Sequence, residues 1–136
     1  MSAELAFQAG LLGHLSASPS VQGVFGHPAR LFDRAPGGIA YPFVSLGRGE
    51  SESADGDGVD LIEHRLTLHV WGRRDDADSV KTGIGALRKA LRAGVPELDG
   101  AWRCVTCHVV YADVFSASDS RLLHALVRVR ALIEAG

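Results

Sequence analysis

One segment near the end of the chain, Arg121–Ile133, has an apolar residue at every second position from Leu123 onward, and this pattern constrains the fold more than any other feature. One face of the segment is wholly apolar, with Leu123, Ala125, Val127, Val129, Ala131 and Ile133. Arg128 and Arg130 occupy the other face. A period of two is typical of a strand that buries one of its sides. The sequence therefore predicts a long strand in a sheet with one apolar face.

Other segments have the composition of partner strands. Leu61–Trp71 alternates in the same way, and Trp102–Phe115 is rich in β-branched and aromatic residues. Tyr41–Leu46 follows a turn signal, and a shorter strand is expected within Arg30–Arg34. The last two long strands are expected to be joined by the polar turn Ser116–Ser120, with its centre near residues 117–118.

Two helices are predicted, one near the start of the chain and one in the middle. Asp75–Arg92 carries an apolar stripe at helical spacing, with acidic residues at its start and basic residues at its end, as the helix dipole favours. Residues 3–16 follow Ser2, a residue type that caps helices, and their apolar stripe is expected to begin at Leu5. Ser16–Pro28 is rich in Ser, Gly and Pro and is expected to form a loop with at most one short turn of helix.

The order of these elements contains no regular βαβ alternation. It favours an α+β fold, with an antiparallel sheet of about four to five strands and with the N-terminal helix and the central helix (about 75–92) packed on it. The 136 residues fit a single domain, 1–136. The acidic, glycine-rich segment at about 48–60 is expected to project as a flexible hairpin arm.

The charge balance argues against a dedicated nucleic-acid binder. The chain has 14 Lys and Arg against 16 Asp and Glu, a formal net charge of −2, whereas phosphate binding favours an excess of basic residues. The N-terminus lacks the basic stretch of a signal peptide, and no apolar run approaches the roughly 20 residues of a membrane span. We therefore expect a protein that is made in the cytoplasm and has no membrane partner.

The sharpest motif is Cys104-Val-Thr-Cys107-His108, which has the form of a covalent haem attachment site. Its surroundings are those of a strand, on which Cys104 and Cys107 would point to opposite faces. That geometry does not suit the edge of one porphyrin. A zinc site would need a second pair of ligands, and His64 and His69 also face opposite ways on their strand. We therefore expect no metal and no cofactor.

Two further motifs are weaker still. Asp55-Gly-Asp57 resembles the start of a calcium loop, but the glycine and the bidentate glutamate that complete such a loop are missing. No GxSxG nucleophile motif occurs, and Gly83-Ile-Gly85 lies inside the central helix rather than after a strand. We identify no catalytic residue and expect a protein that is not an enzyme.

Four segments together resemble the small tail completion family of siphophage-type particles, whose members are known as tail terminator or tail-to-head joining proteins. They are the N-terminal helix, the turn and strand around Tyr41-Pro42-Phe43-Val44, the strand His64–Trp71, and the closing pair that ends in LVRVRALIE. The resemblance covers essentially the whole chain. Relatives of this family occur in prophages and in gene transfer agents.

The resemblance implies a structural role in virion assembly. Members of the family form a homo-hexameric ring that caps the head-proximal end of the tail tube, ends tube polymerisation and forms the joint to the head-neck connector or stopper protein. Double-stranded DNA passes through the lumen without specific binding. The implied partners are thus copies of this chain, the tail tube protein and the connector. The protein would be cytoplasmic during assembly and then part of a phage-like particle.

Two alternatives stay open. One is another neck or head-completion protein of the same particle class, since these small rings share their architecture. The other is a small metal- or thiol-dependent enzyme that uses the segment Cys104–His108.

A ring needs heterologous contacts between different faces of neighbouring subunits, and sheet edges and hairpin arms supply such contacts. The candidate interface residues lie on the arm, on its return strand and just beyond that strand: Arg48, Glu50, Glu52, Asp55, Asp57, Trp71, Arg73 and Arg74. The charged residues could pair within the subunit, with a neighbour or with the tube. Trp71, on the polar face of its strand, could anchor an interface unless a helix covers that face.

Overall fold

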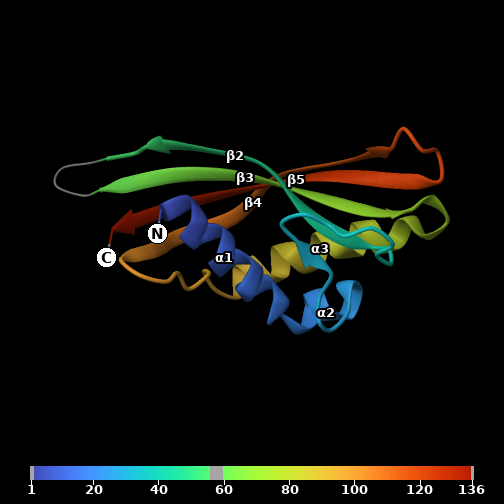
Figure 1. Cartoon of the computed structure of the whole chain (residues 1–136), viewed down its shortest axis with the longest axis horizontal. Coiled ribbons are helices and arrows are strands. Elements are labelled where there is room, and N and C mark those ends of the chain that lie inside the picture. Colours follow the sequence, from blue (N-terminus) through green and yellow to red (C-terminus); the bar gives the residue numbers. More distant parts are fainter. Residues whose placement is uncertain (1, 56–59, 136) are drawn as a thin grey trace.

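The computed structural model describes residues 2–55 and 60–135. The elements of this part are α1 (Ala3–Ser16), α2 (Pro19–Phe25), β1 (Leu31–Phe32), β2 (Phe43–Ser53), β3 (Leu61–Arg73), the 3-10 turn η1 (Arg74–Asp76), α3 (Ala77–Ala93), β4 (Trp102–Ser116) and β5 (Leu122–Ala135). All five strands form one sheet, and the helices lie together on one of its faces (Figure 1). The predicted α+β class is confirmed.

The strand order across the sheet is β1-β2-β3-β5-β4. β2, β3, β5 and β4 pair antiparallel with their neighbours, whereas β1 pairs in parallel with β2. The sheet is therefore mixed, and not wholly antiparallel as expected. The reason is the connection between β1 and β2, which is too long for a tight hairpin turn and returns the chain to the end of the sheet where β1 began.

The core lies between α3 and the face of the sheet that the helices cover. The predicted stripe of α3 is buried there, with Val80, Ile84, Leu87 and Leu91, as are the alternating apolar residues of β5 from Ala125 to Ile133. The helix itself begins at Ala77, because η1 occupies Arg74–Asp76. The opposite face of the sheet carries no helix among the described residues, and we call it the open face.

The N-terminal helix has the predicted bounds but not the predicted buried side. The Ser2 hydroxyl accepts a hydrogen bond from the Leu5 N–H at 3.2 Å and caps the helix as expected. Leu5, however, is 59 % exposed, and the residues fully buried against the core are Phe7, Leu11 and Leu15. Because Phe7 brings the largest side chain, its position sets the rotation of the helix.

The segment expected to be a loop with at most one short turn of helix contains the seven-residue helix α2. Ser18 caps it through a hydrogen bond to the Val21 N–H, and Pro19 is its first residue. That arrangement is a recognised helix start. Val21 and Phe25 are fully buried, and α2 packs on α3.

A β-bulge in β4 changes the geometry of the cysteine motif. Cys104 lies opposite Ile133, and Thr106 lies opposite the next residue of β5, Leu132, so Val105 has no residue opposite it. The extra residue returns Cys104 and Cys107 to the same, buried face. Our prediction that the two thiols point to opposite faces is therefore wrong.

Candidate functional site

The cysteine motif lies with both of its thiols inside the protein. Both thiols are buried, and Cys104 Sγ donates to the Thr106 carbonyl oxygen at 3.3 Å. Contact with Cys104 and burial together raise the pKa of the Cys107 thiol. His108 follows Cys107 on the same strand, β4, and is exposed. Within the residues that the structure describes, no three His, Cys, Asp or Glu side chains come together as a metal site would need.

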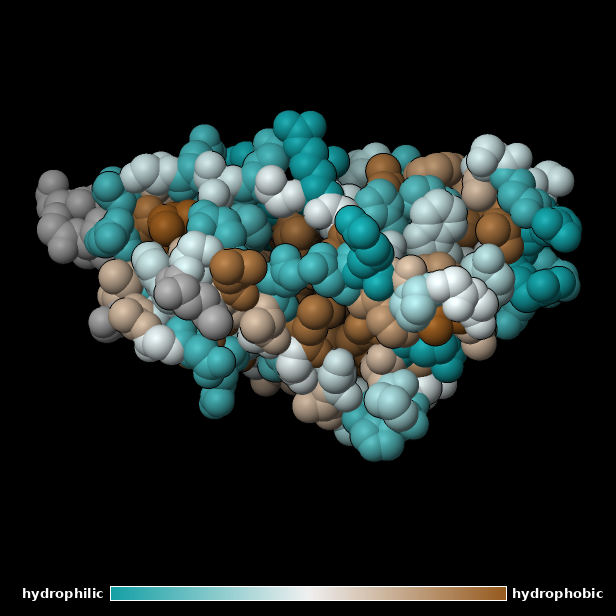
Figure 2. Space-filling model, viewed as in Figure 1, coloured by the Kyte–Doolittle hydropathy of each residue, from teal (hydrophilic) through white to brown (hydrophobic). Residues whose placement is uncertain are grey.

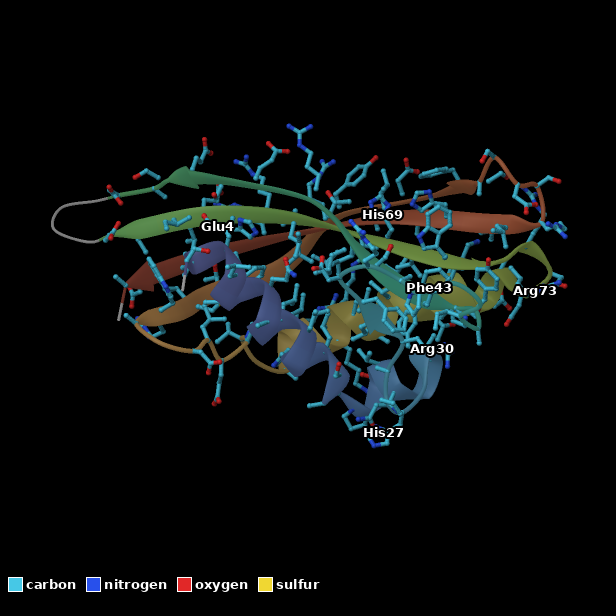
Figure 3. All side chains as sticks on the ribbon, viewed as in Figure 1. Glu4, His27, Arg30, Phe43, His69 and Arg73 are labelled. Carbon is cyan, nitrogen blue, oxygen red and sulfur yellow. The ribbon has the colours of Figure 1, made fainter. Side chains whose placement is uncertain are left out.

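His64 and His69 lie on opposite faces of β3, as predicted. His64 is buried on the helix side, where its ring meets Phe7 edge-on at 5.4 Å between centroids. Burial lowers the pKa of His64. His69 lies on the open face, beside residues that the sequence did not suggest as its neighbours (Figure 3).

Four rings form a line across four strands of the open face. In strand order they are Phe43, Trp71, His124 and Phe115, each directly opposite the next in the ladder, and we call them the aromatic row. Trp71 stacks on His124 with 3.9 Å between ring centroids and an interplanar angle of 14°. The Trp71 indole N–H donates to Ser45 Oγ at 3.4 Å. Since no described helix covers this face, Trp71 is half-buried by its neighbours in the sheet.

His69 lies two residues before Trp71 on β3, on the same face, and so adjoins the aromatic row. Its Nδ1 lies 2.7 Å from Nε2 of His124, a hydrogen bond in which one ring must donate and the other accept. Burial lowers the pKa of both rings. The pair therefore keeps at least one neutral ring, because two imidazolium rings would both be donors.

A shallow hollow of about 590 Å³ lies beside the aromatic row. Its floor includes Phe43, Ser45 and Trp71, and its rim includes Asp33 and Arg34 from the loop after β1. An aromatic floor with a charged rim is typical of a surface that receives a side chain of a protein partner. The side of the molecule drawn in Figure 2 mixes hydrophilic residues with several separate hydrophobic areas.

Towards the arm, the open face carries ion pairs in place of rings. The Glu63 carboxylate is nearly buried, accepts from Arg65 at 2.6 Å and also pairs with Arg130. Arg65 contacts Glu52 of β2 as well, at 3.1 Å. The hydrogen bond from Arg130 lowers the pKa of Glu63. Ion pairs therefore link β2, β3 and β5 at the end of the sheet nearest the arm.

The described part of the arm is an extension of β2 and β3. Arg48 and Glu50 form an exposed ion pair at 3.3 Å, and Asp55 Oδ1 accepts from the Leu61 N–H at 3.0 Å at the end of the ladder. The ladder continues past Glu52 to Ser53. Asp57 lies outside the described residues, as does the tip of the predicted flexible arm.

Arg73 and Arg74 lie at the other end of the sheet, far from the arm (Figure 3). Arg73 pairs with Asp75 at 3.1 Å, and Arg74 Nε donates to the Ser120 carbonyl oxygen at 2.8 Å. The candidate residues predicted from the sequence therefore fall into three separate places: the arm, the aromatic row at Trp71, and the end of the sheet beside the β4–β5 turn.

Comparison with known proteins provides one family and one structural likeness. The family model described as "Tail completion protein gp17" matches residues 9–134. A chain of the solved structure "Virion of native gene transfer agent (GTA) particle" has a similar fold, with a TM-score of 0.83 and 20 % sequence identity. That match covers 98 % of each chain. No curated protein sequence matches significantly. Among the described helices, none is both long and apolar enough to cross a membrane.

Proposed function

The chain belongs to the tail completion protein gp17 family, and on that premise we propose that it caps the head-proximal end of a phage-type tail tube. The match over residues 9–134, nearly the whole chain, carries this proposal. In this role the protein forms a homo-hexameric ring, ends tube polymerisation and provides the joint to the head-neck connector or stopper protein. It acts in the cytoplasm during assembly and then remains in the particle.

The surface of the subunit supports a role in assembly over a role in catalysis. The open face presents the aromatic row and the ion pairs around Glu63, which are contact chemistry. The thiol-dependent alternative loses its basis, because Cys104 and Cys107 are buried on the core side of β4. A net charge of −2 also suits a lumen through which DNA slides without tight phosphate contacts.

Electron microscopy of particles from cells that lack this chain tests the proposal. We expect overlong or uncapped tails beside separate, filled heads, and normal joined particles after complementation with the wild-type chain. Normal particles without the chain would refute the assembly role. Heads without any tails would instead indicate a component of tube formation, and tails of normal length that fail to join would indicate another neck component.

Complementation with Gly85→Ala provides a matched control. Gly85 is exposed on α3, and a methyl group there meets no atom within 4 Å. This variant should restore normal particles to the same extent as the wild-type chain.

A further inference from the structure

The sheet ends on both sides in strands that have unpaired backbone groups. β4 has no described strand on its outer side, and β2 is covered by β1 only at Val44 and Ser45. The segment Leu46–Ser53 of β2 is therefore open along about 27 Å, at about 3.4 Å per residue. Rows of unpaired N–H and C=O groups are templates for pairing with another strand.

The directions of the two edges suit each other. β2 runs antiparallel to β3, β3 to β5, and β5 to β4, so β2 and β4 run in opposite directions. When two copies lie side by side in the same orientation, β4 of one copy therefore meets β2 of the next as an antiparallel pair. This is the arrangement that a ring with its axis along the strands generates.

The charges of the two edges are opposite. Along β4 the exposed charged side chains are Arg103 and Asp113, and the exposed His108 lines one small hollow with Arg88 and Arg92 of α3. Neither Arg88 nor Arg92 makes an ion pair with a described residue. Arg103 pairs with Glu134, which leaves its own side chain 66 % exposed.

The open edge of β2 is acidic. Glu50 and Glu52 have 54 % and 62 % of their side chains exposed, and Asp55 follows them. Glu4 of α1 adds a carboxylate, which accepts from Ser51 at 2.8 Å. Arg48 is the one basic residue of this described segment. Complementary charge of this kind selects β4 against β2, whereas β4 against β4 or β2 against β2 would bring like charges together.

β4 carries only part of the usual protection of a free edge. Bulges at Val105 and Val110 interrupt it, but it contains neither the Lys nor the Pro that many natural edge strands carry. It exposes apolar side chains instead, with Val105 at 38 %, Val110 at 51 %, Tyr111 at 46 % and Phe115 at 37 %. An uncovered apolar edge of this length is typical of a strand that is paired in the assembled state.

We propose that copies of this chain join edge to edge, with the outer side of β4 in one copy paired to Leu46–Ser53 of β2 in the next. The inference rests on the proposed ring and specifies how that ring is held together. The partner is a second copy of the chain, and the contact is heterologous. Each subunit contributes its basic β4 edge on one side and its acidic β2 edge on the other.

Cysteine cross-linking tests the geometry. The double variant Glu50→Cys with His108→Cys places two cysteines in the same row of the sheet. Within one copy these positions are three strand spacings apart, a distance of about 14 Å. A short bismaleimide, whose span is smaller than that separation, links them only between copies. The double variant should give a ladder of cross-linked species from dimer up to hexamer. Each single variant, the wild-type chain and a control pair of Glu50→Cys with Lys81→Cys should remain monomeric on the gel.

Two cross-linking results would overturn the inference. A dimer from His108→Cys alone would show a two-fold contact between β4 edges, and a double variant without a ladder would show that the edges do not meet.

Charge reversal in cells lacking the wild-type chain separates this inference from the proposed function. Glu50→Arg with Glu52→Arg makes both edges basic, and Arg92→Glu with Arg103→Glu makes both edges acidic. Either variant alone should fail to restore joined particles. Expressed together they should restore them, because each acidic edge again meets a basic one. Restoration by either variant alone would refute edge pairing and leave the capping role intact, whereas normal particles without any chain would refute the capping role itself.

Discussion

The contact between α2 and α3 can be measured by two glycine substitutions that differ only in their surroundings. Gly83 of α3 is buried, and a methyl group added to it would lie 2.7 Å from Cζ of Phe25, whose ring is fully buried. Gly85, two residues later on the same helix, is exposed and has no atom within 4 Å of the same methyl group. Replacing either by Ala makes the same change to the helix backbone.

The expected free energies follow from that difference. Alanine in place of glycine in a helix interior stabilises by about 1 kcal/mol, and Gly85→Ala should show the whole gain. At Gly83 the ring of Phe25 must move, and overpacking of a core costs about 1–3 kcal/mol. Gly83→Ala should therefore leave the free energy of unfolding unchanged or lower it by up to about 2 kcal/mol.

Urea unfolding, followed by far-UV circular dichroism, measures both variants, with equal slopes required for the comparison. The Phe25→Leu background supplies the second half of a double-mutant cycle. With the ring removed, Gly83→Ala and Gly85→Ala should agree within about 0.5 kcal/mol. If Gly83→Ala stabilises the wild-type chain as much as Gly85→Ala does, then α2 does not pack on α3 through Phe25 and the reasoning fails.

Two further predictions concern titrating and reactive groups. Burial lowers the pKa of His69 and of His124 below the ordinary value of 6.5, so the unfolded chain takes up protons first and the free energy of unfolding should fall as the pH drops below 6.5. His124→Phe keeps a ring against Trp71 and should reduce that fall, measured as the change in urea midpoint between pH of about 7.5 and about 5. The remainder of the fall is due to His64 and His69, and an unchanged fall would count against a contribution from His124. Cys104 and Cys107 are both buried, so a thiol reagent should label neither in the native protein and both in denaturant, and rapid native labelling of either would contradict the bulged geometry of β4.

Periodicity in the sequence was sufficient for the long elements. The alternation of Leu61–Trp71 and Arg121–Ile133 predicted strands whose apolar faces are buried, and the stripe of α3 predicted a helix that packs on them. In these segments many residues repeat the same spacing of apolar side chains, so a few residues that depart from the spacing do not obscure it. The bounds of α2 were not predicted beyond one short turn of helix, although Ser18 followed by Pro19 is a start signal, because seven residues contain too little periodicity to support them.

The candidate site depended on register, which composition does not encode. The β4–β5 turn centres later than expected, between Asp119 and Ser120, and this places Phe115 opposite His124 in the aromatic row. The bulge at Val105 reversed the predicted direction of one cysteine, since a single extra residue shifts a strand by one face. Arg73 and Arg74 were grouped with the arm because they follow its return strand, but β3 is long enough to carry them to the opposite end of the sheet.

The length of the central strands also has a mechanical consequence. β4 has 15 residues and spans about 50 Å, with the arm at one end of the sheet and the β4–β5 turn at the other. In antiparallel pairs the hydrogen bonds lie across the strands, so tension applied between those two ends loads many of them at once in shear. A pull on an edge at right angles would open them one after another. The subunit should therefore resist stretching along its strands far better than peeling, and in a ring with its axis along the strands the stiff direction coincides with the axis of the tail.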